Sequence, residues 1–544
     1  MTSSSRTLDS LPDSEISVGL RKLDTLPEWL LAPLQAKTVR AALAEAVPEF
    51  ASGAQTLKAC KIKRMLLKDA GRWAGTYTLT IAGSGDETRT LALRGTFTPP
   101  HLRGAATPAA PARPLGAEGW RLALPALGLE LEPEPPETDL IAMPQLTDAD
   151  AARAMLEAGI RASTRAYAEL RIASCQPEII SYKPGSRCTL RYRLGYAEAA
   201  PPTWPTEVIA KTYRKDSKGR NAYEGMAALW ATPLASGATV TLAEPLAYIP
   251  EQKVMVQGPV AAEQSLEDLL KDALKADTPA AYAELHSYMI RAAAGLAALH
   301  QSGVQYGATI SLGERWAELH DLSGKLYAAA PELRGAIDAL LARLEALAAA
   351  NPADAPVPTH GTFNPEQVLI NGPHIGFIDF DDFCMAEPAL DVGLFIAAIK
   401  DIGLNALSDE QASDAATRRA RLARLDAIAE IFLAFYEKLA PISRERVALW
   451  QAWSYLRDAL HFWIKVKPAE HDNGMLMLVD LLQQIGVFPP ADPAEAEAEA
   501  QKARRRRSIP GTRYAAYVGA LLAGIAVNAG DLAELLGDVL PLIS

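Results

Sequence analysis

The densest group of chemistry-bearing residues lies in the segment THGTFNPEQVLINGPHIGFIDFDDF, which runs from residue 359 to residue 383. Its two short apolar runs, VLI and IGFI, predict a strand, a turn and a second strand, with the flanking polar residues displayed together. His360, Gln367 and Asp379 then converge at one end of this hairpin. Such an arrangement can hold a divalent cation against phosphates. Taken alone, a run such as IDFDD is more often a simple acidic turn.

The segment resembles the catalytic hairpin of the aminoglycoside phosphotransferase and choline kinase superfamily, which is related to protein kinases. That family has a His-Gly-Asp loop, an Asn five residues after the Asp, a strand ending Ile-Asp-Phe or Ile-Asp-Trp, and then Pro-x-x-Asp. The corresponding residues here are His360-Gly361-Thr362, Gln367, Ile378-Asp379-Phe380 and Pro388-Ala389-Leu390-Asp391. The resemblance extends over residues 150–487. It implies a two-lobed, protein-kinase-like fold that uses ATP and Mg²⁺, with Gln367 and Asp379 as the metal ligands.

Two positions depart from the family pattern. Thr362 stands where the family places the Asp that accepts the proton of the substrate hydroxyl, and a threonine hydroxyl is no general base near neutral pH. A missing base removes about 100- to 10,000-fold in rate unless Asp381, Asp382 or Glu366 replaces it. Gln367 is a milder change, because its amide oxygen can still bind Mg²⁺. Phosphoryl transfer relies chiefly on positioning and electrostatics, so a slow kinase and a catalytically impaired pseudokinase both remain open.

Other polar residues near the motif are predicted to have structural roles. His360 belongs to the catalytic set with Thr362 and Asp379, and the resemblance implies that it fixes the loop. Asp391 is expected to anchor backbone amides rather than bind metal. His286 and His300 lie on helical patterns among apolar neighbours, where a lone histidine is more often a core residue than a ligand.

A kinase-like site also needs a strand lysine for the phosphates and a helix glutamate that holds this lysine. Lys211 lies in the apolar strand EVIAKTYR, where an ammonium group requires a partner. Glu224 follows in GRNAYEGMAALW, which is typical of a helix. We therefore predict an ion pair between Lys211 and Glu224. The alternative, without the downstream motif, is an edge-strand lysine and an ordinary surface charge.

The turn YKPGSR, at residues 182–187, resembles the family's nucleotide-covering loop. Backbone amides around Gly185 can reach phosphate oxygens, and Lys183 and Arg187 can add positive charge, although an ordinary hairpin turn has the same appearance. The segment KVMVQGPV predicts the last strand and the hinge, where Val256 and Gly258 offer backbone groups to an adenine. The chain has no GxxxxGKS/T motif and hence no P-loop.

The predicted fold class is α+β, with a small antiparallel sheet lobe, a mostly helical lobe and an extra N-terminal α+β region. The expected domains are the N-terminal region at 1–140, a kinase-like N-lobe at 150–260, a helical C-lobe with the catalytic hairpin at 261–487, and a linker with an apolar helix at 488–544. Long amphipathic helices are expected at residues 282–300, 315–349, 420–439 and 447–465.

The N-terminal region has its own strand pattern. The runs KIKRMLLKD, TYTLTI and TLALRGTF predict three strands, which we consider a degenerate copy of the later sheet as one alternative. A helix is expected at residues 29–47, and another in DADAARAMLEAGIRAS. The stretches TPPHLRGAATPAAPARPLG and LEPEPPETD are typical of linkers or surface loops.

The composition limits the functional class. The 544 residues suggest several domains, and 49% hydrophobic with 22% charged residues indicates a soluble globular protein. A net charge of −11 argues against a nucleic-acid surface. The four cysteines are spaced singly, which indicates neither a disulfide framework nor a zinc site, and the polar N-terminus lacks a signal-peptide pattern. We expect a cytoplasmic protein that acts on a small-molecule acceptor.

Three further features leave alternatives open. Asp381, Asp382 and Glu387 would give an acidic lining suited to a cationic acceptor, although family members phosphorylate sugars, amines and amino alcohols alike. The apolar tail YAAYVGALLAGIAV is too short to span a bilayer, so it packs on the main domain, on a second copy as a homo-oligomer, or on a membrane surface beside an arginine run. An aromatic cluster with helical spacing is expected in the core, or else lining an acceptor pocket: Trp450, Trp453, Tyr455, Phe462 and Trp463.

Overall fold

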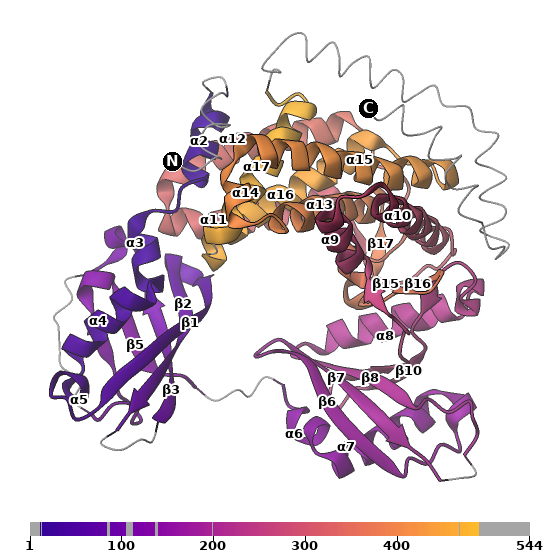
Figure 1. The fold of residues 1–544 in the computed structure, drawn as a ribbon, viewed down its shortest axis with the longest axis horizontal. Coiled ribbons are helices and arrows are strands. Elements are labelled where there is room, and N and C mark those ends of the chain that lie inside the picture. Colours follow the sequence, from indigo (N-terminus) through magenta and orange to yellow (C-terminus); the bar gives the residue numbers. More distant parts are fainter. Residues whose placement is uncertain are drawn as a thin grey trace. The chain divides into compact units, whose positions relative to one another are not determined.

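A computed structural model describes residue 11 and residues 14–83, 88–104, 113–135, 140–197, 200–466 and 468–488 (Figure 1). The chain packs into two compact units. Unit 1 takes its residues from 1–136, 312–350 and 452–491, and unit 2 from 137–311, 351–451 and 492–544. The predictions for the apolar tail and for a homo-oligomer formed through it lie outside the described residues.

Unit 1 contains a five-stranded sheet in the order β1-β2-β3-β5-β4. The strands are β1 (Thr56–Lys68), β2 (Arg72–Ala82), β3 (Thr88–Phe97), β4 (Leu122–Leu124) and β5 (Leu129–Pro133). Side chains alternate along β2, so that Trp73 and Tyr77 are buried while the intervening threonines are half-buried. The three predicted strands are confirmed. The expectation that LEPEPPETD is entirely a linker is wrong, because its first residues pair with β3 as part of β5.

Helices complete unit 1, and among them α4 and α11 pack against strand β1. They are α2 (Glu15–Leu23), α3 (Glu28–Leu31), η1 (Ala32–Leu34), α4 (Ala36–Ala46), α5 (Pro48–Ala51), α11 (Leu312–Ala329), η7 (Pro331–Leu333), α12 (Arg334–Ala350), α17 (Pro468–Gln484) and the second half of α16 (Arg444–Lys465). The single helix expected at residues 29–47 is broken at η1, because Pro33 there has no backbone N–H to donate. The long helix expected from residue 315 likewise breaks before Pro331.

Unit 2 begins with an antiparallel sheet in the order β10-β11-β8-β7-β6. Its strands are β6 (Ser174–Lys183), β7 (Arg187–Gly195), β8 (Glu207–Tyr213), β10 (Pro245–Ile249) and β11 (Val254–Gln257). Helix α7 (Ala149–Ser163), whose N-cap is Asp148, buries Leu156 and Ile160 in the core of this sheet. Helix α8 (Asp216–Trp230) follows β8 after a two-residue connection. The predicted strands of this lobe and its first helix are confirmed.

The second part of unit 2 is mostly helical. Its main helices are α9 (Leu266–Ala276), α10 (Pro279–His300), α13 (Ala389–Asn405), α14 (Asp409–Ser413), α15 (Ala415–Leu439) and the first half of α16. The predicted hairpin is β15 (Val368–Asn371) and β16 (His374–Phe377), which lie between β12 (Gln264–Ser265) and β9 (Thr241–Leu242). A second small sheet joins β13 (Thr309–Ile310), β17 (Cys384–Ala386) and β14 (Val357–Thr359).

The predicted α+β class, with antiparallel sheets followed by helices, is confirmed. The packing assigns residues 312–350 and 452–491 to unit 1, whereas we expected them in the helical lobe. One cause is that the Trp73 indole N–H donates to the carbonyls of Trp463 and Ile464, each at 3.1 Å. The consecutive domain boundaries remain a prediction.

The aromatic cluster of α16 is buried, as expected for core packing. The Trp463 indole N–H donates to the Leu23 carbonyl at 2.8 Å within unit 1, and the Trp450 indole N–H donates to Glu387 at 2.8 Å within unit 2. All four cysteines are buried and none of them is in a disulfide bond. Among the described helices, none is long and apolar enough to cross a membrane.

Candidate active site

The loop between β14 and η8 (Pro365–Gln367), residues 360–364, packs against the turn that follows β16, residues 379–382. Gly361 in this loop has a φ of +86°, a conformation that side-chain-bearing residues rarely adopt. A Cβ atom at Gly361 would lie 2.0 Å from the Asp382 carbonyl oxygen. Only glycine therefore permits this contact, which fixes the position of Thr362 relative to the 3₁₀ turn η9 (Phe380–Asp382).

Asp391, at the start of α13, holds the same loop from behind. Its carboxylate accepts hydrogen bonds from the backbone N–H groups of His360 at 2.6 Å and Gly361 at 2.8 Å. His300 lies 3.1 Å from this carboxylate through Nε2 and 2.6 Å from the Tyr436 hydroxyl through Nδ1. The structural roles predicted for Asp391 and His300 are confirmed.

His360 is buried beneath the loop and fixes it rather than facing the pocket described below. Its Nε2 lies 2.9 Å from the Ile378 carbonyl oxygen, at the end of the hairpin. The ring also packs against Phe380, with 4.6 Å between ring centroids. His360 thus links the loop to the acidic turn, which agrees with the role that the resemblance implied.

Asp381 is the centre of a buried charge network. Its side chain is only 2% exposed, and it accepts from Arg187 at 2.8 Å, Lys211 at 3.2 Å and the Tyr213 hydroxyl at 2.7 Å. Burial and the neighbouring Asp381 raise the pKa of Tyr213 well above its ordinary value. Burial favours a neutral Lys211, yet Asp381 and Asp379 together raise the pKa of this lysine, so its ammonium form persists.

Asp379 lies at the entrance to η9 with a φ of +70°, in the left-handed region. Its carboxylate accepts a hydrogen bond from Lys211 and lies 3.7 Å from Arg187. Burial opposes ionisation of Asp379, but the charge and hydrogen bond of Lys211 and the charge of Arg187 hold its pKa well below the usual range. Asp379 is therefore an anion in the folded protein at neutral pH.

The predicted ion pair between Lys211 and Glu224 is wrong. Lys211 is held by Asp379 and Asp381, whereas Glu224 is exposed on α8 and accepts a hydrogen bond from the Tyr306 hydroxyl at 2.7 Å. An exposed carboxylate cannot compensate a lysine side chain that is only 10% exposed, so the buried carboxylates of the turn take that role.

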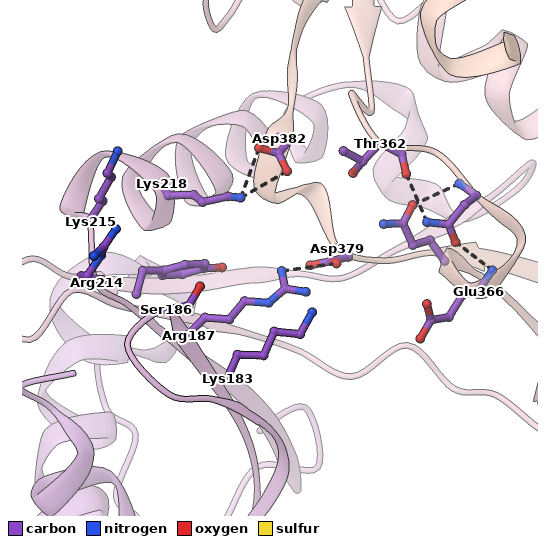
Figure 2. Close-up of a pocket in the computed structure, with 13 residues that line it drawn as sticks. Lys183, Ser186, Arg187, Arg214, Lys215, Lys218, Thr362, Glu366, Asp379 and Asp382 are labelled. Carbon is purple, nitrogen blue, oxygen red and sulfur yellow. Dashed lines mark hydrogen bonds and ion pairs between the residues drawn. The ribbon is translucent and has the colours of Figure 1, made fainter. Parts of the chain in front are cut away.

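A pocket of about 480 Å³ opens in front of this network (Figure 2). Its lining combines the β6–β7 turn, the β8–α8 connection, the loop and the turn: Lys183, Ser186, Arg187, Tyr213, Arg214, Lys215, Lys218, Thr362, Asn364, Glu366, Gln367, Asp379 and Asp382. Five of these residues are basic and three are acidic. A polar, predominantly basic pocket suits a phosphate-bearing ligand.

The pocket brings together five of the residues predicted for the site: Lys183, Arg187, Thr362, Gln367 and Asp379. Lys211 lies behind it, bound to Asp379. The remaining predicted residues do not line this pocket: Gly185, Glu224, Val256, Gly258 and His360. The N–H of Gly258, predicted to face an adenine, donates instead to the Glu244 carbonyl at 2.8 Å.

The two predicted metal ligands both line the pocket. The Gln367 amide oxygen accepts from the Asn364 backbone N–H at 3.2 Å, which caps η8 (Pro365–Gln367). In the described part of the chain, no three His, Cys, Asp or Glu residues are grouped to hold a metal ion by themselves. This donor set is compatible with Mg²⁺, which commonly takes one or two carboxylates and completes its shell with phosphate oxygens and water.

The acidic lining expected for a cationic acceptor is largely neutralised. Asp381 is bound by three donors, and Glu387 is buried in an ion pair with Arg446, with Nε to Oε2 at 2.8 Å. Asp382 lies 3.3 Å from the Lys218 ammonium. Of the three acids expected to line an acceptor site, Asp382 does line the pocket, whereas Asp381 and Glu387 are buried and do not.

The basic residues after β8 were not predicted as part of the site. Arg214, Lys215 and Lys218 line the pocket because α8 begins directly after the strand that carries Lys211. The signal was the charged run RKDSKGR immediately after that strand. Tyr213 was also missed, since its role depends on Asp381, which is distant in sequence.

Comparison with known proteins identifies the segment that carries the loop and the turn. Residues 263–427 match the sequence model of the phosphotransferase enzyme family, and this match includes the loop, the hairpin and Asp391. This segment is thus similar in sequence to that family. The predicted aminoglycoside phosphotransferase-like resemblance is therefore confirmed, and residues 263–427 are called the phosphotransferase segment below. No curated protein matches the chain significantly.

The chain is also similar to solved structures at low identity. A glucosamine kinase in complex with glucosamine, ADP and inorganic phosphate has 14% identity and a TM-score of 0.40, with 81% of this chain and 99% of that chain covered. A choline/ethanolamine kinase family protein from Mesorhizobium loti has 16% identity, a TM-score of 0.34, and 69% and 99% coverage. The GDP complex of a mutant aminoglycoside 2′-phosphotransferase has 13% identity, a TM-score of 0.38, and 62% and 99% coverage.

Proposed function

We propose that this protein is an ATP- and Mg²⁺-dependent phosphotransferase that acts on a small hydroxylated molecule. The observation that carries the proposal is the basic pocket built around Asp379 in the phosphotransferase segment. A triphosphate needs several positive charges around it and a metal-binding carboxylate at its terminal phosphates, and the pocket offers both.

In this proposal the positive side chains bind and orient the triphosphate. Lys183 and Arg187, at the two ends of the β6–β7 turn, line the pocket, and Lys211 holds Asp379 in place through a hydrogen bond. Arg187 already lies 2.8 Å from Asp381, so its guanidinium is fixed before a ligand arrives. Fixed charges of this kind stabilise the transferring phosphoryl group without a reorganisation cost at the moment of reaction.

Asp379 and Gln367 are the residues that would hold Mg²⁺. When bound, this ion neutralises charge between the terminal phosphates and orients them for in-line attack. Asp379 is suited to this role because it remains ionised and lines the pocket. Gln367 can present its amide oxygen after giving up its hydrogen bond to the Asn364 N–H.

A second candidate is a pseudokinase, which binds a nucleotide or a partner and transfers nothing. Thr362 favours it, because this residue lines the pocket where a family member would present a catalytic carboxylate. Thr362→Asp distinguishes the candidates. A large gain in transfer would show that the rest of the site is assembled but lacks its base.

The first test is calorimetric binding of ATP with and without Mg²⁺ to the wild type and to Asp379→Ala. The proposal expects Mg²⁺-dependent binding in the wild type that Asp379→Ala loses. Asp409→Asn, at an exposed position on α14, serves as the matched surface control. Transfer from radiolabelled ATP is then screened over sugars, amino sugars, amines and amino alcohols. Absence of nucleotide binding by the wild type would exclude the enzyme.

A further inference from the structure

The loop lacks a carboxylate at Thr362, so any proton acceptor for the substrate hydroxyl must come from elsewhere in the pocket. Three carboxylates line it: Glu366, Asp379 and Asp382. Asp381 is excluded, because it is buried and already accepts from Arg187, Lys211 and Tyr213. Asp379 is excluded as well, because it holds Mg²⁺ in the proposed function and is already paired with Lys211 and Arg187.

Asp382 lies against the loop, next to the position where the family has its catalytic aspartate. The position of a Cβ on Gly361, the residue before Thr362, would be 3.4 Å from the Asp382 Cβ and 2.0 Å from its carbonyl oxygen. The side chains of Thr362 and Asp382 both line the pocket (Figure 2). A carboxylate from the turn thus occupies the neighbourhood that the loop leaves without one.

The carboxylate of Asp382 is also held in place by an ion pair within the pocket, whereas the carboxylate of Glu366 is not. Each oxygen of the Asp382 carboxylate lies 3.3 Å from the Lys218 ammonium at the start of α8, and 42% of its side chain remains exposed for a substrate. Glu366 is exposed on η8, and its carboxylate interacts with the charge of Lys271 on α9 rather than with a residue of the pocket. An oriented carboxylate is the better general base, because base catalysis requires hydrogen-bond reach to the proton.

We infer that Asp382 replaces the missing loop aspartate as the general base of the phosphoryl transfer, with Lys218 as its positioning residue. This inference rests on the proposed function. The acceptor hydroxyl gives its proton to the Asp382 carboxylate while its oxygen bonds to the γ-phosphorus of the nucleoside triphosphate. The bond from that phosphorus to the β–γ bridging oxygen breaks, and its electron pair leaves with the nucleoside diphosphate. Protonated Asp382 then returns its proton to water.

The experiment measures ADP formation from MgATP, first with water as the acceptor and then with any acceptor found by the screen. Asp382→Asn should lower kcat by about 100-fold or more, with KM for MgATP changed by less than about 3-fold. Glu366→Gln should lower kcat by much less. The double variant Thr362→Asp with Asp382→Asn should regain at least about 10-fold over Asp382→Asn, because it restores a carboxylate beside the acceptor.

The double variant also controls for folding, since Thr362→Asp cannot rescue a chain that Asp382→Asn has unfolded. Lys218→Met should lower kcat less than Asp382→Asn and should leave Asp382→Asn unchanged when the two are combined. Equal kcat in the wild type and Asp382→Asn, or a larger loss in Glu366→Gln, would overturn the inference while leaving the proposed function intact. If the wild type binds MgATP but forms no ADP, the inference about Asp382 is overturned too. If the wild type does not bind MgATP, the proposed function itself is overturned.

Discussion

Replacement of Lys211 by methionine tests whether the buried charge network holds the site together. The substitution keeps most of the apolar stem and removes the ammonium that is bound to Asp379 and Asp381. Two carboxylates then lose their shared cation. Asp381, with a side chain only 2% exposed, retains Arg187 and Tyr213 as donors, whereas Asp379 retains only the 3.7 Å approach of Arg187.

The expected cost follows from this geometry. Removal of one partner from a buried ion pair typically destabilises a protein by about 3–5 kcal/mol. The low end applies, because Asp381 keeps two donors and the Asp379 side chain is 25% exposed. A loss of about 3 kcal/mol corresponds to an increase of roughly 100-fold in the equilibrium constant for local opening.

Hydrogen exchange of β8 measures this opening directly, without requiring the whole chain to unfold in one step. Amides of β8 in Lys211→Met should exchange roughly 100-fold faster than in the wild type at pH 7. Lys271→Met is the matched control, because Lys271 pairs with Glu267 at an exposed (i, i+4) position and should change stability by no more than about 0.5 kcal/mol. Unchanged exchange of β8 in Lys211→Met would show that the ammonium of Lys211 does not stabilise this strand.

The pH dependence gives a second check on Lys211→Met. The pKa of Asp379 is lower in the folded protein than in the unfolded chain, so its contribution to stability is present above about pH 4 and is lost as the pH falls toward the folded value. Lys211→Met removes that contribution. The difference in thermal midpoint between variant and wild type should therefore be largest near pH 7 and should shrink below about pH 4. A difference that grows on acidification would contradict this account.

Three further predictions concern positions around the site and in the helical part. Gly361→Ala should lower the free energy of unfolding by at least about 2 kcal/mol in thermal unfolding, because the φ of Gly361 is +86° and the new Cβ would overlap the turn. The control Gly372→Ala, with open space around the new Cβ, should lower it by about 1 kcal/mol. Glu387→Gln should cost about 3 kcal/mol because it breaks a buried ion pair, whereas Glu345→Gln at an exposed pair should change the midpoint little. Burial lowers the pKa of His286 to about 4, so stability should fall as the pH drops from about 6.5 to 4, and His286→Phe should remove that dependence in pH-dependent unfolding.

Much of the site could be predicted because its motif is local in sequence. The spacing of the loop, the hairpin and the turn predicted β15 and β16 and placed Thr362, Gln367 and Asp379 in one pocket. The apolar pattern around Lys211 correctly indicated a buried lysine that needs a partner. These inferences depend on residues within one element or one short connection, where side-chain periodicity determines the geometry.

The partner of Lys211 could not be predicted from the same patterns. Glu224 and Asp381 are both carboxylates at plausible positions, and only tertiary packing shows that Glu224 is exposed while Asp381 is buried. The chain segments that make up unit 1 could not be predicted for a similar reason. The indole of Trp73 hydrogen-bonds to residues nearly four hundred positions later in the chain. Neither pairing leaves a periodic signal in the sequence.

The three aspartates of the turn have different roles because their side chains lie in different surroundings. Asp381 is buried and binds Arg187 and Lys211, whereas Asp379 and Asp382 line the pocket. A carboxylate at position 362 would lie beside Asp382, and two adjacent anions repel each other unless one of them is protonated. Threonine at position 362 avoids this repulsion and leaves the Asp382 carboxylate paired with Lys218. A neutral residue at position 362 is therefore consistent with the charged turn. In the proposed reaction this turn supplies both the metal-binding carboxylate and the proton-accepting carboxylate.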